Sequence, residues 1–392
     1  MIKLRISTLT AITALVLAAC GGTGPTATPS VSLPTSVGEG EGALTVLAWP
    51  GYAEDGSTQP DVDWVQPFEK ATGCQVDVTT FGTSDEAYQL FTSGAGATYD
   101  VISASGDASL RLVAGGNVQP VNTDLVPNYA DIFPSLKDQP WNTVDSVHYG
   151  IAHGRGANLL MWRTDDVTPA TDSWGVVFDE NSPYKGKVTA YDAPIYIADA
   201  AVYLMATQPD LKITNPYALD QAQFDASVAL VKKQRTVIGE YWSDYTKEIE
   251  AFTNGNSVVG TSWQIIANLL QAQDPPAPVK AIKPKEGSTG WSDTWMINSK
   301  TKHLNCAYKW LNHIVSPSVN AQVAEWFGEA PANQKSCDLT ADKNHCTIFQ
   351  AAETNWKDVY YWTTPTKTCL DGRGDICVGF DKWIQAWTEI KG

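Results

Sequence analysis

The stretch 43-ALTVLAWPGY-52 joins an apolar run to an aromatic turn, and it predicts a buried strand over residues 43–49. Apolar residues at helical spacing follow over 61–72 and stop at Gly73, which predicts a helix. The alternation then continues with strand 75–79, helix 84–92, strand 99–102 and helix 107–114. Strands that alternate with helices at this spacing predict βαβ units around a mainly parallel sheet.

Three turns in this half of the chain come directly after predicted strands, at 49–52, 81–84 and 103–106. In parallel sheets, ligands bind beyond the carboxyl ends of the strands. The turns supply aromatic rings, hydroxyls and glycines. Ordinary βα turns also favour Gly and Ser, but three such turns together favour a binding site.

A second α/β pattern runs over about 167–285, with a strand at 187–190, a long helix at 221–234 and a buried strand at 257–263. A strand at 294–297 and a helix at 306–315 follow. The fold class is therefore α/β, and the length is sufficient for two domains.

The N-terminus carries Lys3 and Arg5, an apolar run too short to span a bilayer, and then Leu17-Ala18-Ala19-Cys20. This resembles the lipobox of bacterial lipoproteins and predicts a signal peptide over 1–19, lipidation of Cys20 and a flexible tether over 20–42. Such a chain is extracytoplasmic and held at the membrane surface by its lipid alone. The alternative is an ordinary secretory signal with an incidental cysteine.

Without Lys3 and Arg5 the chain has 25 basic residues against 43 acidic ones, a net charge of −18. This excludes nucleic acid and anionic lipid as expected partners, because both need a basic surface. The chain has 15 Trp and 15 Tyr, a composition that suits aromatic walls around a small polar ligand as well as a core.

Six further cysteines form an even set, which in an exported chain predicts disulfides. Fifteen connectivities are possible for six cysteines. Proximity favours Cys337–Cys346 and Cys369–Cys377, which leaves Cys74 for Cys306. A zinc site is the alternative, but the chain lacks C-x-x-C spacing, and we expect neither a metal nor a cofactor.

A series of phrases extends over nearly the whole mature chain: 47-LAWPGY-52, 68-FEKATG-73, 99-YDVIS-103, 184-YKG-186, 291-WSD-293 and 331-PAN-333. In their order and spacing they resemble the solute-binding proteins of bacterial ABC importers, in the spermidine/putrescine-binding branch. The resemblance implies a two-lobed periplasmic-binding-protein-like fold with a ligand cleft between the lobes. It also implies a monomer that captures a small amine by cleft closure, delivers it to an ABC transporter permease and catalyses no reaction.

The family's chain crosses between its lobes more than once. The resemblance implies lobe I over 43–156 and 293–335 and lobe II over 157–292 and 336–392.

By position the resemblance also implies a ligand-binding set: Trp49, Tyr52, Ser103, Ser105, Asp192, Trp263, Trp291, Asp293 and Phe327. An ammonium that leaves water needs a carboxylate partner, and aromatic faces add cation–π attraction. Asp293 in the W-x-D phrase and Asp192 would each meet a positive nitrogen. The alternative for each aspartate is a helix cap or a surface acid.

The chain departs from the family where Ile195 replaces a second acid and where Arg155 stands near an aromatic position. If Arg155 faced the ligand, it would suit a carboxylate and favour a zwitterion such as 4-aminobutyrate over a polyamine. The alternative is that Arg155 forms a salt bridge between the lobes.

Two other classes of protein are possible. The phrase 260-GTSWQ-264 lacks the last glycine of a G-x-S-x-G nucleophile turn, and the five His have no triad or H-E-x-x-H context. A lipoprotein hydrolase is therefore disfavoured. A non-transport surface lipoprotein remains the other alternative, and a ligand-induced thermal shift would distinguish it from a transport receptor.

Overall fold

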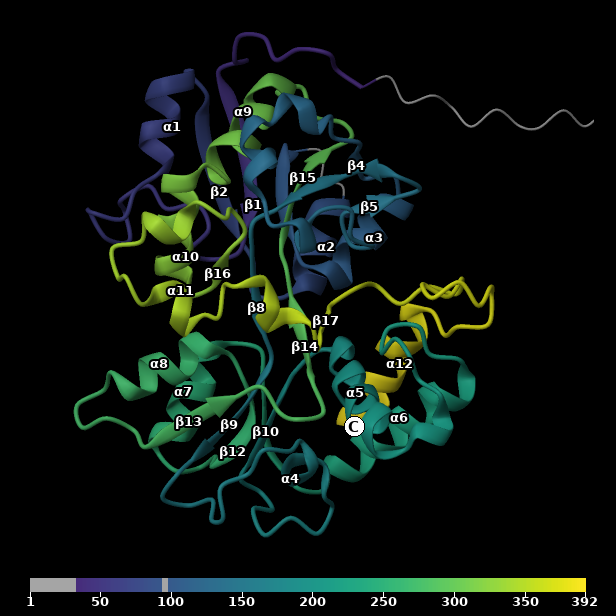
Figure 1. The fold of residues 1–392 in the computed structure, drawn as a ribbon. Coiled ribbons are helices and arrows are strands. Elements are labelled where there is room, and N and C mark those ends of the chain that lie inside the picture. The colour runs from purple at the N-terminus through teal and green to yellow at the C-terminus, as the bar shows by residue number, and fades with distance from the viewer. Residues whose placement is uncertain (1–32, 94–97) are drawn as a thin grey trace, which may run out of the picture. The chain divides into compact units, whose positions relative to one another are not determined.

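The structure is a computed structural model that describes residues 33–93 and 98–392 (Figure 1). The expected signal peptide, the lipidation of Cys20 and the tether up to residue 32 lie outside the described residues.

The first lobe is built on a sheet with the strand order β2-β1-β3-β15-β4, and β7 also pairs with β15. Its strands are β1 Ala43–Ala48, β2 Gln75–Thr80, β3 Val101–Ala104, β4 Val118–Gln119, β7 Gly150–Ala152 and β15 Thr294–Asn298. Strand β1 is parallel to β2 and β3, as the βαβ pattern predicts, while β15 is antiparallel to β3. Its helices are α1 Val65–Thr72, α2 Ser84–Thr92, α3 Gly106–Ala114, α9 Leu304–Ile314 and α10 Pro317–Phe327.

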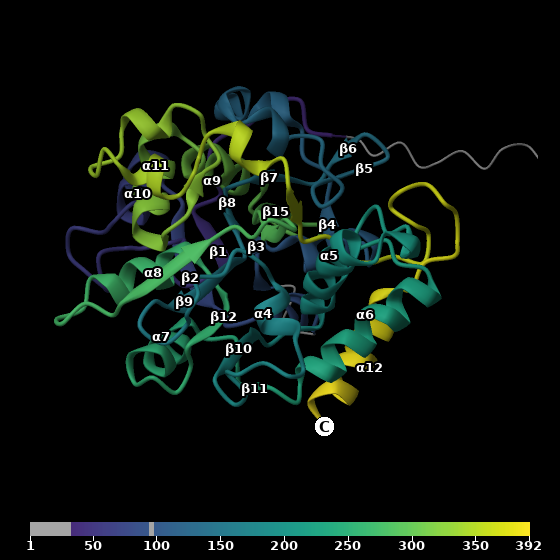
Figure 2. The same ribbon diagram turned by 60° about the horizontal axis from the view of Figure 1, so that its bottom comes forward.

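The second lobe is built on a sheet with the order β11-β10-β12-β9-β13. Its strands are β9 Leu159–Arg163, β10 Val188–Tyr191, β11 Ile238–Trp242, β12 Val259–Ser262 and β13 Val279–Ile282. Its helices are α4 Gly175–Phe178, α5 Ile197–Thr207, α6 Gln221–Gln234, α7 Tyr245–Thr253, α8 Gln264–Gln271 and α12 Phe380–Lys391. Figures 1 and 2 show α6 and the C-terminal α12 side by side on one side of this sheet.

A third, four-stranded sheet lies between the other two, with the order β16-β8-β14-β17 (Figure 1). It consists of β8 Gly154–Ala157, β14 Ser288–Trp291, β16 Ala330–Pro331 and β17 Val359–Tyr361. Strands β8 and β14 are antiparallel neighbours that carry the chain from the first sheet to the second and back. A two-stranded sheet of β5 Thr143–Val144 and β6 Val147–His148 and the short helix α11 His345–Ile348 complete the strands and α-helices of the described residues.

The segment after Ser336 differs from the expected lobe boundary, because it packs on the first lobe rather than the second. The Ser336 hydroxyl donates to the Pro317 carbonyl, and the backbone N–H of Ala341 donates to Glu325 of α10. The chain reaches the second lobe only after β17, where Trp362 joins that lobe's hydrophobic core. Hydrogen bonds to α10 therefore attach the start of the segment 336–392 to the first lobe, although we expected that segment in the second lobe.

The expected tether is also shorter than the sequence indicated, because residues 33–42 dock on the first lobe. The carboxylate of Glu41 accepts hydrogen bonds from the backbone N–H groups of Asn305 and Cys306 in the first turn of α9. The carbonyl of Pro34 accepts from the Asn122 side chain. An acidic side chain at a helix N-terminus satisfies donors that have no partner within the helix, and this fixes a segment of low apolar content.

The predicted disulfide pairing is confirmed, with bonds Cys74–Cys306, Cys337–Cys346 and Cys369–Cys377. The first joins the end of α1 to α9 across a sequence separation of 232 residues. The other two close short loops with separations of 9 and 8 residues.

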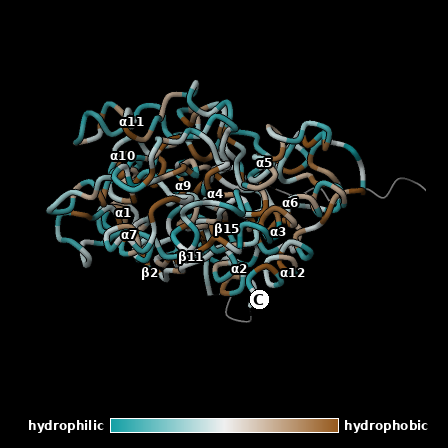
Figure 3. Tube along the Cα trace, turned by 90° about the horizontal axis from the view of Figure 1, so that it is seen from below, coloured by the Kyte–Doolittle hydropathy of each residue, from teal (hydrophilic) through white to brown (hydrophobic). Residues whose placement is uncertain are grey.

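Each lobe has a large buried apolar cluster of its own. Hydrophobic segments lie among the central elements, while most outer loops are hydrophilic (Figure 3). Within the described residues, no helix has both the length and the apolar character to cross a membrane.

Candidate functional site

The site centres on Asp293, which lies between β14 and β15 and is only 3% exposed. Its carboxylate accepts hydrogen bonds from the Tyr52 hydroxyl at 2.7 Å and from the Ser105 hydroxyl at 2.5 Å. Tyr52 follows β1 and Ser105 follows β3, so two of the predicted strand-end turns converge on one acid. Burial raises the pKa of Asp293 to about 6, because a charged carboxylate loses hydration there.

A second buried acid, Glu329, shares the Tyr52 hydroxyl at 3.0 Å. A phenol has one proton and can donate it to only one carboxyl group. The distance to Asp293 is shorter, so Tyr52 donates to Asp293 and Glu329 carries the proton that it donates to the phenol oxygen. Burial, together with the charge of Asp293, raises the pKa of Glu329 well above its ordinary value, in agreement with a protonated acid.

The nearest basic side chain, His153, does not neutralise these acids. Its Nδ1 lies 3.3 Å from Glu329 Oε1, but burial lowers the pKa of His153 to about 3, so the ring is neutral. Within the described part of the chain, no lysine or arginine forms an ion pair with Asp293 or Glu329.

A third buried acid, Asp107, lies in the first turn of α3, two residues after Ser105. Its side chain belongs to a residue that is 4% exposed, and its Oδ1 has no hydrogen-bond partner among the described residues. Burial raises the pKa of Asp107 to about 7, against the lowering effect of the Ser84 side chain, and the charges of Asp85 and Asp293 add to the increase. This role could not be predicted from the sequence, because an aspartate in the first turn of a helix is common for helix stability alone.

A chain of aromatic rings extends from this acid cluster across both lobes. The ring of Tyr52 lies 4.3 Å from that of Phe327, which lies 5.8 Å from Trp291. Trp291 lies 6.2 Å from Trp263, whose ring is 5.5 Å from Tyr191. Tyr191 in turn stacks on Trp362 at 5.4 Å. Tyr191 and Trp362 were not in the expected set, since each stands in an ordinary apolar run and only the fold shows its ring contacts.

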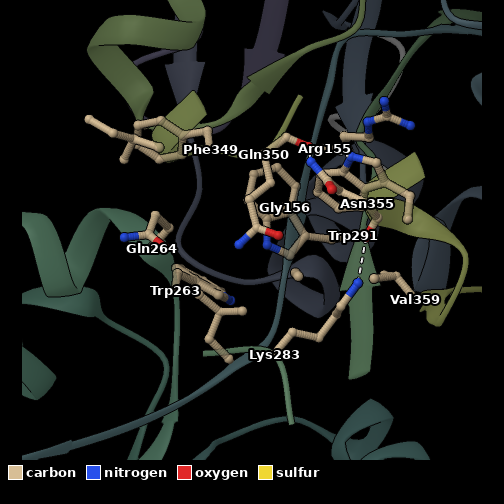
Figure 4. Close-up of a pocket in the computed structure, with 15 residues that line it drawn as sticks. Arg155, Gly156, Trp263, Gln264, Lys283, Trp291, Phe349, Gln350, Asn355 and Val359 are labelled. Carbon is tan, nitrogen blue, oxygen red and sulfur yellow. Dashed lines mark hydrogen bonds between the residues drawn. The ribbon is translucent and has the colours of Figure 1, made fainter. Parts of the chain in front are cut away.

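A pocket adjoins this chain of rings, and Figure 4 shows Trp263 and Trp291 on its wall together with Gly156. Gly156 is required there, because a Cβ atom would lie 2.3 Å from the Trp291 ring. Lys283 crosses the pocket and donates from Nζ to the Asn355 carbonyl at 2.5 Å.

Arg155 is among the residues that line this pocket, but its guanidinium is paired within the protein. Figure 4 shows its side chain directed away from the space between Trp263 and Trp291. Its guanidinium donates to the Ser135 hydroxyl and the Ala351 carbonyl, both at 2.8 Å, and approaches Glu353 at 3.6 Å.

The Arg155 guanidinium also lies over the rings of Phe133 and Trp356. Arg155 is therefore a structural cation that binds the segment after α11. Its ion pair with Glu353 lies on the first lobe, so it is not the salt bridge between the lobes that the alternative expected.

Asp192 also lies outside the acid cluster. Its carboxylate is ion-paired with Lys391 and accepts from Trp387 Nε1 at 3.1 Å, so it ties β10 to α12. The last two expected residues contact each other, because the backbone N–H of Trp49 donates to the Ser103 hydroxyl at 3.2 Å. The Trp49 ring packs on Phe81 at 4.6 Å, so this pair fixes the strand ends beside the site.

The geometry thus brings together Tyr52, Ser105, Trp263, Trp291, Asp293 and Phe327 of the expected set and adds Asp107, Tyr191, Glu329 and Trp362. No group of His, Cys, Asp and Glu side chains in the described part of the chain is arranged to hold a metal ion.

A comparison with models of known protein families identifies the family of this chain. The model of the bacterial extracellular solute-binding protein family matches residues 63–351. The chain belongs to this family.

Relatives and solved structures agree with that assignment. The spermidine/putrescine-binding periplasmic protein of Escherichia coli is 22% identical over 324 residues, which cover 80% of this chain and 89% of that protein. The putrescine-binding periplasmic protein of the same organism is 23% identical over 294 residues, covering 71% of this chain and 76% of that protein. A structure described as a putative spermidine/putrescine ABC transporter from Listeria monocytogenes has a TM-score of 0.71 at 18% identity, with 89% of this chain and 99% of that one covered. The fold is therefore that of a two-lobed solute-binding protein.

Proposed function

We propose that the chain is the solute-capturing component of an ABC importer and that its cleft binds a small organic cation of the amine class. The observation that carries the proposal is a buried carboxylate without a buried cation. Asp293 is held by two hydroxyls, stands beside Asp107 and Glu329, and is surrounded by aromatic rings. The relatives named for spermidine and putrescine support the same class of ligand.

An ammonium group supplies what this site lacks. Paired with Asp293, it would restore the ionised carboxylate and replace its lost hydration with a charge-assisted hydrogen bond. The faces of Trp291, Phe327 and Tyr52 would cover the methylene groups of the ligand, and each cation–π contact contributes about 0.5–2 kcal/mol. An anionic ligand would instead meet three acids.

The sequence favoured a zwitterionic ligand only because Arg155 could bind its carboxylate. That reason no longer applies, because the Arg155 guanidinium is already paired within the protein. A polyamine or another simple amine is therefore favoured over an amino acid such as 4-aminobutyrate. Binding of this kind involves no bond-making step, so the protein acts as a receptor rather than as an enzyme.

We also propose that β8 and β14 form the hinge about which the two lobes close on the solute. Both strands connect the two sheets, and β14 ends two residues before Asp293. Lobe closure would then bring Tyr191, Trp263 and Trp362 of the second lobe toward the acids of the first.

The lipid anchor at Cys20 is part of the same proposal. Its basis is the sequence 17-LAAC-20 and the short segment before the docked residues 33–42. Changing Cys20 to Ala should release the domain from the membrane or leave an uncleaved precursor. Mature, membrane-bound protein in that variant would contradict the anchor.

The test of ligand class is a thermal-shift screen of the purified protein with putrescine, spermidine and 4-aminobutyrate. A ligand at 100 times its Kd stabilises the folded state by about 2.7 kcal/mol. Asp293→Asn should lose the shift, while Asp192→Asn serves as a matched control that removes an aspartate outside the cluster. Equal shifts for the wild type and Asp293→Asn would refute the assignment of the cleft.

A further inference from the structure

The indole N–H of Trp263 is already used within the protein. Trp263 lies between β12 and α8, where its ring contacts those of Trp291 and Tyr191. Its Nε1 donates to the side-chain carbonyl oxygen of Asn158 at 2.9 Å. The ring therefore offers its aromatic surface to the cleft, while its one hydrogen-bond donor is committed elsewhere.

Asn158, the residue after β8, is the first member of a buried series of hydrogen bonds that ends at Asp199. Its side-chain amide donates to the Thr289 hydroxyl of β14 at 2.7 Å. The Thr289 hydroxyl donates to Asp199 of α5 at 2.9 Å. All three residues are at most 2% exposed, so water does not compete with these contacts.

The series has a fixed direction, because each member has a limited number of protons. The Trp263 indole nitrogen can only donate, so the Asn158 side chain must turn its carbonyl oxygen toward it. The amide nitrogen of Asn158 therefore faces Thr289, and its carbonyl oxygen faces Trp263. A flipped amide would set two donors against each other at the indole, at a cost comparable to that of an unpaired buried donor.

We propose that Asn158, Thr289 and Asp199 are positioning residues that keep the Trp263 N–H away from the solute and present the indole face, which makes this wall of the cleft selective for cations. The selectivity rests on the proposed function. An ammonium group has only donors, so a free indole N–H would repel it, whereas the ring face attracts it. The series also links this wall to β8 and β14, the two strands that join the lobes.

The experiment begins with a signal that needs no ligand. The indole N–H resonances are observed in protein carrying ¹⁵N-labelled tryptophan, and that of Trp263 is assigned by its loss in Trp263→Phe. Thr289→Val removes the hydroxyl at nearly constant volume, and Thr289→Ser keeps it. We expect Thr289→Val to shift the Trp263 resonance and speed its exchange with solvent, Thr289→Ser to restore both, and the other indole signals to stay in place.

The second part uses putrescine as the probe in titration calorimetry. Thr289→Val should weaken binding about fivefold, as expected for the loss of one hydrogen bond, and should have no further effect when combined with Trp263→Phe. If Thr289→Val does not fold, Asn158→Ala is used in its place. An unchanged Trp263 resonance and exchange rate in the folded variant would overturn the proposal. If the wild type binds no putrescine, the indole signals still decide it, so failure of the proposed function is distinguishable.

Discussion

Replacing Asp293 by Asn should make the ligand-free protein more stable while it abolishes binding of the solute. Burial raises the pKa of Asp293 from 3.8 to about 6. The folded state therefore holds this proton more tightly than the unfolded state, and the contribution of Asp293 to stability falls as the pH rises from about 4 to about 6. A difference of about two units at 1.36 kcal/mol per unit amounts to roughly 3 kcal/mol above that range.

The neutral amide should recover most of this cost, since its oxygen can accept from Tyr52 and its nitrogen can donate to the Ser105 hydroxyl. Chemical denaturation followed by circular dichroism at pH 8 should show Asp293→Asn as the more stable protein. The gap should close near pH 4, where the wild-type acid is protonated in the folded state.

Asp192→Asn is the control, because it removes an ion pair with Lys391 and should bring no gain in stability. If Asp293→Asn were less stable than the wild type at pH 8, the carboxylate would be stabilising without a ligand. Asp293 would then not be a buried charge that lowers the stability of the ligand-free protein.

Three further outcomes are expected. The affinity for putrescine should fall by up to tenfold per pH unit below about pH 6, where Asp293 is protonated; calorimetric titrations that give the same affinity at pH 5 and pH 8 would disagree with this. Replacing Cys74 and Cys306 by Ser should lower the free energy of unfolding by about 5 kcal/mol in denaturant titrations, and replacing Cys337 and Cys346 by about 3 kcal/mol, because the Cys74–Cys306 bond closes the longer loop. The reverse order would contradict this dependence on loop length. Arg155→Gln should cost roughly 3 kcal/mol of stability, because it leaves Ser135 and the Ala351 carbonyl without their donor. The same variant should change the affinity for putrescine less than twofold. A large change in affinity with unchanged stability would show that Arg155 contacts the ligand.

The local parts of the fold could be predicted from the sequence, because their signals are local. Helix α2 has the predicted bounds, with Thr83 as its N-cap accepting from the Glu86 N–H. Helix α6 also has the predicted bounds and begins with a capping box formed by Asp220 and Gln223. Apolar runs between such signals were sufficient to place β1 and β15 within one or two residues.

The misplaced parts depend on contacts between residues far apart in the chain. The docking of Glu41 requires Asn305 and Cys306, which are more than 260 positions away. Asp192 forms an ion pair with Lys391 instead of joining the acid cluster, and no local sequence pattern predicts that contact.

The site residues divide in the same way. Tyr52 and Ser105 were predictable because each follows a strand, and Asp293 because it stands in the W-x-D phrase. Asp107 and Glu329 were not, since a buried acid differs from a surface acid only in what the fold places around it.

A crystal structure of the complex would show whether Asp293 receives the cation of the solute. The protein would be crystallised with the amine that gives the largest thermal shift. We expect a ligand nitrogen within about 3 Å of the Asp293 carboxylate, with the rings of Trp291 and Trp263 against the ligand's methylene groups. A ligand bound elsewhere, with Asp293 still held only by Tyr52 and Ser105, would contradict this role of Asp293.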